Sequence, residues 1–318
     1  MERELEFEKP VAEFEKAIEK LKSSAAESKG DFGQQIAELE KKCEDRKREI
    51  YDTLSPWQTV QVARHPKRPV LYDYISLIFK DFVELRGDRR FGDDRALIGG
   101  FAMLDTQKVM LVGHSKGKNI EENVRRNFGM AKPEGYRKAL RLMRLAEKFN
   151  VPIVSFIDTA GAYPGLDAEQ RGQAEAIARN LTEMAKLEVP VVAIVTGEGG
   201  SGGALGIGVA DSVLMLSNAV YSVISPEGCA SILWRDASYS AQAAESLKIT
   251  AKSLLSLGVI DEIVKEPAGG AHSNHQAAAN AIKSAVLKHL KKLIPLSPQK
   301  LIQRRFEKFS EMGKFTKG

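Results

Sequence analysis

The chain has 318 residues, of which 43% are hydrophobic and 28% are charged, and its formal net charge is +5. This composition is typical of a globular protein with one large or two modest domains, and it does not by itself indicate nucleic-acid binding. No apolar run is long enough to span a membrane, and the chain opens with the charged stretch MERELEFEKP, so we expect neither membrane insertion nor secretion. Two cysteines are too few for a zinc ribbon or a disulfide framework, which favours the cytoplasm.

Residues 1–54 are rich in Glu and Lys, with sparse apolar residues at helical spacing. Between two such stretches, SSAAESKGDFG has the composition of a connector, so we predict a hairpin of two amphipathic helices. We interpret this hairpin as an arm for subunit association rather than as a catalytic element. The apolar positions are Leu5, Val11, Phe14, Ile18 and Leu21, followed by Ile36, Leu39, Cys43 and Ile50.

Residues 55–295 are expected to form the main domain, and residues 296–318 a basic helical tail. Within the main domain, apolar strand-like runs alternate with amphipathic helical runs, which predicts an α/β fold with a buried, largely parallel sheet. The expected elements are a helix over 72–86, a strand hairpin over 96–104 and 108–117, a helix from Pro133, strands over 151–158 and 189–196, a helix over 167–187, and a long helix over 274–293.

The stretch TGEGGSGGALGIG, residues 196–208, matches two well-known motifs literally. Gly197, Gly199 and Gly202 spell the dinucleotide fingerprint G-x-G-x-x-G. The helix that follows is too short for that fold, and no acidic residue lies near residue 222, so the dinucleotide interpretation is disfavoured. No Lys-Ser or Lys-Thr pair follows the glycines, which excludes a P-loop.

Gly199, Ser201 and Gly203 spell the serine-hydrolase elbow G-x-S-x-G, with a strand before it and a helix after it. Acids and histidines follow in the hydrolase order, so this hypothesis stays open, although so glycine-rich a stretch matches the motif easily by accident. We favour Ser201 as a helix N-cap rather than as a nucleophile. The candidate partners are Asp211, Asp236 or Asp261, and His272 or His275.

A third interpretation uses the backbone. Glycines before a helix expose N–H groups at its N-terminus, where they can stabilise an oxyanion without any side chain. A second glycine loop, GAYPG at 161–165, also follows a buried strand. Both loops lie at the carboxyl ends of successive strands, so we expect them to face one crevice.

Six long motifs together resemble one family: the alpha subunit of the carboxyltransferase component of bacterial acetyl-CoA carboxylase. The resemblance covers nearly the whole chain, including the arm. It departs at Ala160, where the family usually has Pro. The motifs are IDTAGAYPG, GQAEAIARN, GEGGSGGALGIG, ISPEGCASILW, RRNFGMAKPEGYRKALRLM and EPAGGAH.

The resemblance implies a crotonase-like spiral of repeated ββα units and a chain that is half of an enzyme. It implies a beta subunit that carries the zinc ribbon, an α2β2 assembly with active sites between alpha and beta, and no metal in this chain. The implied reaction is transfer of a carboxyl group from carboxybiotin, on a biotin carboxyl carrier protein, to acetyl-CoA. The product is malonyl-CoA for fatty acid biosynthesis, and biotin carboxylase completes the ATP-binding complex.

The resemblance also implies site residues. We expect the amides of Gly202 and Gly203 to stabilise the biotin ureido oxygen, and replacing Gly203 with Val to abolish transfer but not assembly. Gly199 and Gly200 are expected to shape the turn beside the carboxybiotin pocket. The residues Gly161, Ala162 and Tyr163 are expected to line it.

Other polar residues have simpler interpretations. Glu198 is expected to be structural, Asp158 to cap a turn, and His114 and His272 show no metal-ligand spacing. Basic residues between 118 and 144 could meet CoA phosphates, a carrier protein or, as a competing function, RNA, but a solvated helix face is the simpler interpretation. They are Arg125, Arg126, Arg137, Lys138, Arg141 and Arg144.

Overall fold

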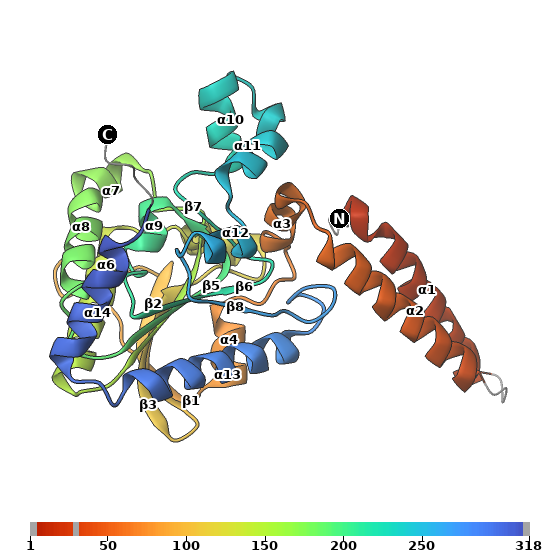
Figure 1. Cartoon of the computed structure of the whole chain (residues 1–318), viewed down its shortest axis with the longest axis horizontal. Helices are drawn as coiled ribbons and strands as arrows, with labels where there is room; N and C mark the ends of the chain where they lie inside the picture. The colour runs from red at the N-terminus through yellow and green to blue at the C-terminus, as the bar shows by residue number, and fades with distance from the viewer. Residues whose placement is uncertain (1–4, 28–31, 314–318) are drawn as a thin grey trace.

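A computed structural model describes residues 5–27 and 32–313. A helical arm projects from the main domain, and a second small helical group, α10 and α11, projects from another side (Figure 1). The middle of the predicted connector and both ends of the chain lie outside the described residues. None of the described helices has the length and apolar character needed to cross a membrane.

The arm consists of α1 (Lys9–Glu27) and α2 (Gly33–Asp52), preceded by the short helix η1 (Glu6–Glu8). The two long helices pack along each other, so the predicted hairpin is confirmed. The apolar residues at helical spacing form the seam between them. They are Val11, Ile18 and Cys43, which are buried, and Phe14, Ile36, Leu39 and Ile50 around them.

The predicted helix over 72–86 is only half right. α4 (Leu71–Ile78) ends where Phe79 adopts an extended conformation, and β1 (Lys80–Glu84) follows. β1 pairs antiparallel with β2 (Leu97–Leu104). Helical spacing of apolar residues continues through 86, but pairing with a strand further along the chain satisfies the backbone of this segment instead.

One sheet organises the main domain, in the order β1-β2-β3-β4-β5-β6-β8. β2 and β3 (Gln107–His114) form the predicted antiparallel hairpin, and every pair from β3 onward is parallel. The predicted, largely parallel sheet is therefore confirmed. The remaining strands are β4 (Ile153–Thr159), β5 (Val191–Gly200), β6 (Ser212–Leu216), β7 (Val220–Ser222) and β8 (Glu262–Val264).

Helices cover the sheet and connect its strands (Figure 1). α6 packs against α8 and against β2 and β3, whereas α13 packs against α4. The expected helix over 167–187 is broken in two at Gly172, whose φ of +81° ends one helix and starts the next. The other helices are α3 (Pro56–Ala63), α5 (Ile120–Arg125), η2 (Asn127–Gly129), α6 (Pro133–Lys148), α7 (Leu166–Gln170), α8 (Gln173–Met184), α9 (Ser201–Leu205), α10 (Pro226–Trp234), η3 (Ala237–Tyr239), α11 (Ser240–Leu247), α12 (Ala251–Ser256), α13 (His275–Leu293) and α14 (Pro298–Ser310).

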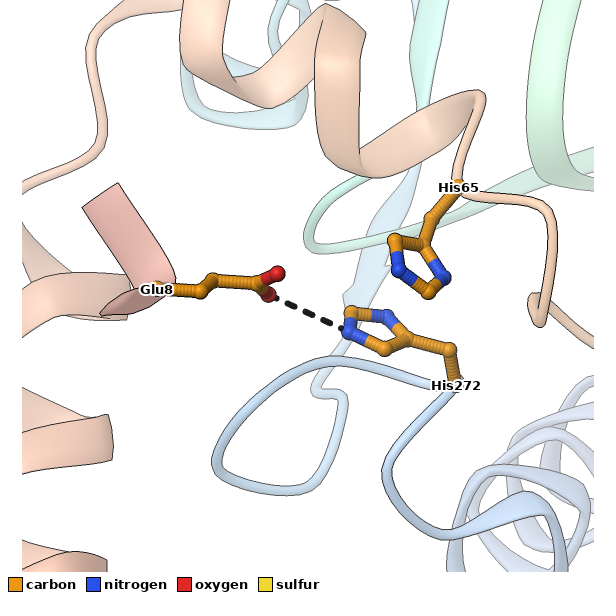
Figure 2. Close-up of side chains that lie close together, drawn as sticks. All are labelled: Glu8, His65 and His272. Carbon is orange, nitrogen blue, oxygen red and sulfur yellow. Dashed lines mark hydrogen bonds and ion pairs between the residues drawn. The ribbon is translucent and has the colours of Figure 1, made fainter. Parts of the chain in front are cut away.

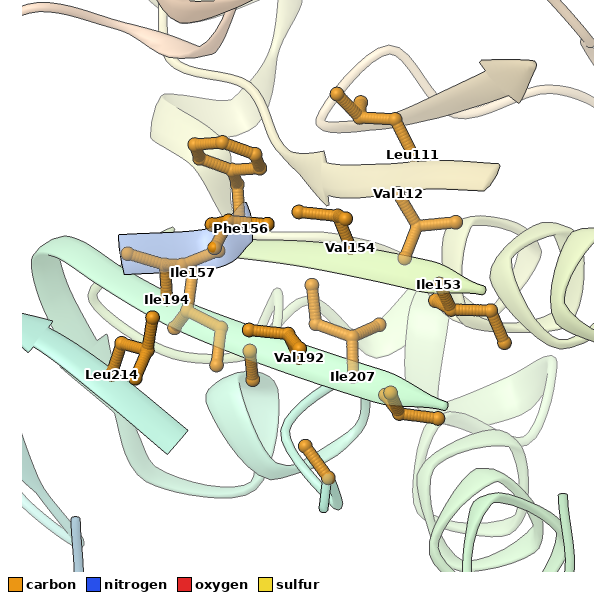
Figure 3. Packing of buried hydrophobic residues seen from close by; sticks show 14 of the residues in the cluster. Leu111, Val112, Ile153, Val154, Phe156, Ile157, Val192, Ile194, Ile207 and Leu214 are labelled. Carbon is orange, nitrogen blue, oxygen red and sulfur yellow. The ribbon is translucent and has the colours of Figure 1, made fainter. Parts of the chain in front are cut away.

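The core lies on both faces of the central strands (Figure 3). β4 and β5 are buried along almost their whole length, which explains why their sequences read as continuous apolar runs rather than alternating ones. Apolar side chains from neighbouring strands interdigitate there. Among them are Leu111, Val112, Ile153, Val154, Phe156, Ile157, Val192, Ile194 and Leu214.

The C-terminal helix α14 is part of this packing rather than a free basic tail. Leu301 joins the core, and the Arg305 side chain has no exposed surface. The Arg305 guanidinium binds both carboxylate oxygens of Asp211, at 3.0 and 2.8 Å, and three backbone carbonyls at the end of α8 and in the turn before β5. This one side chain therefore ties the end of the chain to the entry of β5.

Replacing Arg305 with Met is expected to lower the free energy of unfolding by about 3–5 kcal/mol, because Asp211 would stay buried without its partner. Arg304→Met, at the exposed neighbouring position, is the matched control and should change it by less than about 0.5 kcal/mol. Urea denaturation followed by circular dichroism measures both. Equal effects of the two substitutions would contradict this account.

Candidate active site

The glycine stretch differs from the predicted turn, because β5 continues through Gly200. Along its first half β5 pairs with β6, and along Glu198–Gly200 it pairs with β7 instead. Gly199 also pairs with Thr159 of β4. The sheet thus divides at the carboxyl end of β5, and the two glycine loops lie at this division.

The two loops touch backbone to backbone. A β-carbon at Gly200 would lie 2.1 Å from the carbonyl oxygen of Ala160. A β-carbon at Gly203 would lie 2.4 Å from the backbone nitrogen of Ala162 and 2.4 Å from the carbonyl carbon of Gly161. Real β-carbons do not approach other atoms so closely, so only glycine permits this contact. The structure thus brings the two loops together, and the crevice that they were expected to face stays a prediction.

Gly202 differs from its neighbours. A β-carbon there would meet only the Ile177 side chain, at 3.8 Å, which is ordinary contact. Gly202 and Gly203 lie in the first turn of α9, and their amides have no hydrogen-bond acceptor within the described ranges. Gly202 is partly exposed and Gly203 is buried. Of the other expected residues, Ala162 and Tyr163 are partly buried, and the Tyr163 amide donates to the carbonyl of Ala131.

Ser201 is not the N-cap of α9. The N-cap is Gly200, and Ser201 is the first helical residue, with a φ of +51° and an exposed side chain. The predicted capping role is wrong because β5 runs into the helix without a turn. In residues 5–27 and 32–313 no histidine binds the Ser201 hydroxyl, and the candidate bases His272 and His275 bond to other groups. The structure therefore does not assemble a serine-hydrolase triad.

A chain of ion pairs lies beside the loops, and sequence reasoning missed its centre. Lys116, just beyond β3, donates to Asp158 at 2.7 Å and to Glu198 at 3.2 Å. Glu198 also accepts from Arg64 at 2.6 Å, and Arg64 continues to Glu227 of α10. The pairs link the ends of β4 and β5 to α3 and α10. In the sequence, the only sign of this role was that Lys116 follows an apolar strand and so lies at its carboxyl end.

Electrostatics hold this network in its charged form. Burial opposes the charge on Lys116, but the carboxylates of Asp158 and Glu198 outweigh that effect and raise its pKa to about 12. Burial likewise favours a neutral Glu198, but Lys116 and Arg64 outweigh it and lower the pKa of this carboxyl below its usual value. Glu198 is thus an ionised structural group, as expected from the sequence. Asp158 does more than cap a turn, because its carboxylate also accepts from the Glu198 amide at 3.0 Å.

The basic side chains of the segment 118–144 that the sequence singled out form contacts within the protein. Arg137 binds Asp88 at 2.8 Å, and the ammonium of the buried Lys138 binds Asp93 and the carbonyl of Asp94. The remaining four basic side chains are also engaged within the protein. Arg125 binds Glu121, Arg126 binds Ser115 and lies over the Tyr72 ring, Arg141 binds the carbonyls of Gly87 and Arg86, and Arg144 binds Glu183. These contacts leave little basis for an RNA-binding face.

The fold gives two histidines surroundings that their spacing in the sequence did not indicate. Burial, with the charge of Lys116, lowers the pKa of His114 to about 3, although a hydrogen bond with the Gly203 backbone acts in the opposite direction. His272 lies beside His65 and Glu8, which come from distant parts of the sequence (Figure 2).

Two solved structures have a similar fold. Transcarboxylase 12S matches with a TM-score of 0.56 over 70% of this chain and 42% of that chain, at 21% identity. The beta subunit of P. aeruginosa geranyl-CoA carboxylase matches with a TM-score of 0.56 over 77% of this chain and 46% of that chain, at 16% identity. The fold is that of the crotonase-like carboxyltransferases, which confirms the predicted fold class.

Sequence comparison identifies the family within that class. The family described as "Acetyl co-enzyme A carboxylase carboxyltransferase-like" matches residues 4–313. A relative from Geobacter metallireducens is 56% identical over 312 residues, with 98% of each chain covered, and one from Anoxybacillus flavithermus is 56% identical over 315 residues, with 99% and 97% covered. Both are named acetyl-coenzyme A carboxylase carboxyl transferase subunit alpha. The chain belongs to this family, as its motifs predicted.

Replacing Lys116 with Met is expected to lower the free energy of unfolding by about 3 kcal/mol at pH 7, because two buried carboxylates lose their shared partner. The folded-state pKa of Glu198 is lowered, so its contribution is present above its unfolded pKa and is lost as pH falls. The difference in the free energy of unfolding between Lys116→Met and the unaltered protein should therefore shrink below about pH 4.5. Urea denaturation at pH 7 and pH 4 measures it.

Lys118→Met is the matched control, because the Lys118 side chain is 61% exposed in its pair with Asp73. Its effect should stay below about 1 kcal/mol at both pH values. An equal loss in the two variants, or a Lys116→Met effect that does not depend on pH, would contradict the account of a buried network.

Proposed function

We propose that this chain, with a beta subunit, transfers a carboxyl group from carboxybiotin to acetyl-CoA and so produces malonyl-CoA for fatty acid biosynthesis. The observation that carries this proposal is the near full-length similarity to relatives that are named for this activity. The contact between the two glycine loops supports it, because it leaves two unpartnered amides at the carboxyl end of the sheet. We also propose that the protein works in the cytoplasm.

The site can stabilise negative charge on a carbonyl-derived oxygen without any titratable side chain. Carboxybiotin supplies the carboxyl group, and its ureido oxygen gains negative charge as that group leaves. The Gly202 and Gly203 amides, at the start of α9, are the proposed donors to this oxygen. Gly161, Ala162 and Tyr163 line the pocket on one side, with Gly199 and Gly200 on the other. The two amides without an acceptor fit such a group.

The same proposal assigns the partners. The acyl-CoA side of the site is supplied by a beta subunit that carries the zinc ribbon, in an α2β2 assembly, and biotin arrives on a carrier protein charged by biotin carboxylase. This chain has only two cysteines, which agrees with a zinc ribbon located elsewhere. The arm, residues 1–54, is proposed to take part in subunit association.

The test is malonyl-CoA-dependent carboxylation of free biocytin, measured with the purified chain alone and with the beta subunit from the same source. We expect activity only in the mixture, because the pocket is proposed to lie between the chains. Activity of this chain alone would show that the site is complete within it. A verified complex without activity would overturn the proposed function.

Gly203→Ala is expected to lower kcat at least about 100-fold in this assay, because its β-carbon would push apart the two loops that position the amides. The larger side chain of Gly203→Val would displace the loop further, so a loss of activity in that variant would say less about the amides than the sequence analysis assumed. Gly202→Ala is the matched control: it keeps the amide, meets only Ile177, and should retain activity within about tenfold. Equal activities of the two variants would show that the loop contact is not required.

Ser201→Ala is expected to leave the carboxylation rate almost unchanged, since no base contacts this hydroxyl within the described residues. A fluorophosphonate probe should not label the unaltered protein at Ser201. Stoichiometric labelling that the substitution removes would favour a hydrolase instead.

A further inference from the structure

Three potential metal ligands from remote segments meet at the joint between the arm and the main domain (Figure 2). Glu8 ends η1 in the arm, His65 follows α3, and His272 lies in the loop before α13. One ligand atom of each lies within 4.8 Å of those of the other two. A carboxylate and two imidazoles are a donor set that binds Zn²⁺ and leaves a fourth position for water.

Glu8 and His272 already have the separation that one ion requires. The Nε2 atom of His272 lies 3.2 Å from Oε1 of Glu8. Two ligands at about 2.0–2.1 Å from a tetrahedral ion are separated by about 3.3 Å. The Tyr51 hydroxyl also lies 3.4 Å from this Nε2, whereas the other ring nitrogen, Nδ1, is buried and has no hydrogen-bond partner among the described residues. The ring can carry its proton on Nδ1 and offer Nε2 to a metal.

His65 supplies the third potential ligand and lies directly against His272. Its Nδ1 accepts a hydrogen bond of 3.2 Å from the Lys67 amide, whereas its Nε2 has no hydrogen-bond partner in the parts of the chain that the structure describes. The ring stacks on His272 with centroids 3.9 Å apart, and Figure 2 shows the stacked rings facing the Glu8 carboxylate.

The surroundings support a bound ion. The side chains of Glu8 and His272 are 15% and 11% exposed, so the cluster is partly accessible to solvent. The Tyr51 hydroxyl donates to the same Glu8 oxygen and orients the carboxylate from α2. The nearest buried cation along the chain, Arg68, is already paired, because both of its terminal nitrogens donate to the Glu266 carboxylate.

We propose that Glu8, His65 and His272 bind one Zn²⁺ ion at the joint between the arm and the main domain. The ion would connect three segments that are far apart in the sequence and hold η1 against the main domain. Sequence spacing gave no sign of this site, because the ligands have no local pattern and converge only in the fold. The site is separate from the glycine loops and does not depend on carboxyl transfer.

The test uses the full chain, stripped of metal and titrated with Zn²⁺ in competition with a chromophoric chelator. We expect one Zn²⁺ per chain. Since loss of an outer-shell partner of a metal ligand costs 10–100-fold in affinity, loss of a ligand should cost at least about 100-fold. Glu8→Gln, His65→Gln and His272→Gln should each show this loss. His289→Gln is the control, because His289 bonds to Ser212 and Glu262 outside the cluster.

Hydrogen exchange of the amides in η1 and α1 gives the second readout. Zn²⁺ should slow this exchange at least tenfold in the unaltered chain and in His289→Gln, but not in Glu8→Gln, whose side chain has the same shape as glutamate. Circular dichroism checks that the variants are folded. The proposal fails if no stoichiometric Zn²⁺ binds or if the three variants bind like the control. Binding without slower exchange in the arm would overturn the role as a connection between arm and domain.

Discussion

The close approach of two backbones at the carboxyl end of the sheet is the constraint on which the candidate site depends. A β-carbon at Gly200 or Gly203 would lie only 2.1–2.4 Å from backbone atoms of residues 160–162, so β5 and α9 approach this loop more closely than any side chain allows. Such an approach exposes peptide groups without intervening side chains, and it fixes the first turn of α9 beside the loop that follows β4. The division of the sheet, with β5 pairing first with β6 and then with β7, provides the space for this turn.

A network of charged groups stabilises that arrangement. Lys116 binds acids at the ends of both central strands, and Arg64 extends the same network to α10. The short segment after α3 is central here. Arg64 binds Glu198, Arg68 binds the carbonyl of Thr196 and Glu266, and His65 stacks on His272 beside the arm. Residues 64–68 therefore contact both β5 and the His272 loop beside the arm.

The errors in the sequence predictions have a common cause. The helical pattern over 72–86 is interrupted because Lys80–Glu84 finds a strand partner in β2. Gly199 and Gly200 shape a close contact rather than a turn, because β7 pairs with them and the Tyr221 ring and the Ala160 carbonyl occupy the space of a side chain. The basic residues between 125 and 144 were expected mostly to form a solvated helix face, but acids from other elements pair with Arg137, Lys138 and Arg144. In each case a distant segment outweighed the local pattern.

The sequence by itself determined the class of fold, the hairpin arm, the family, and the meeting of two glycine loops at strand ends. These features follow from local periodicity, from long contiguous motifs and from the rule that parallel strands end on one edge. Only the tertiary structure decided which glycines touch backbone, that Lys116 is the centre of the ion pairs, and that Glu8, His65 and His272 converge. Those contacts join residues far apart in the chain, and spacing along one sequence carries no information about them.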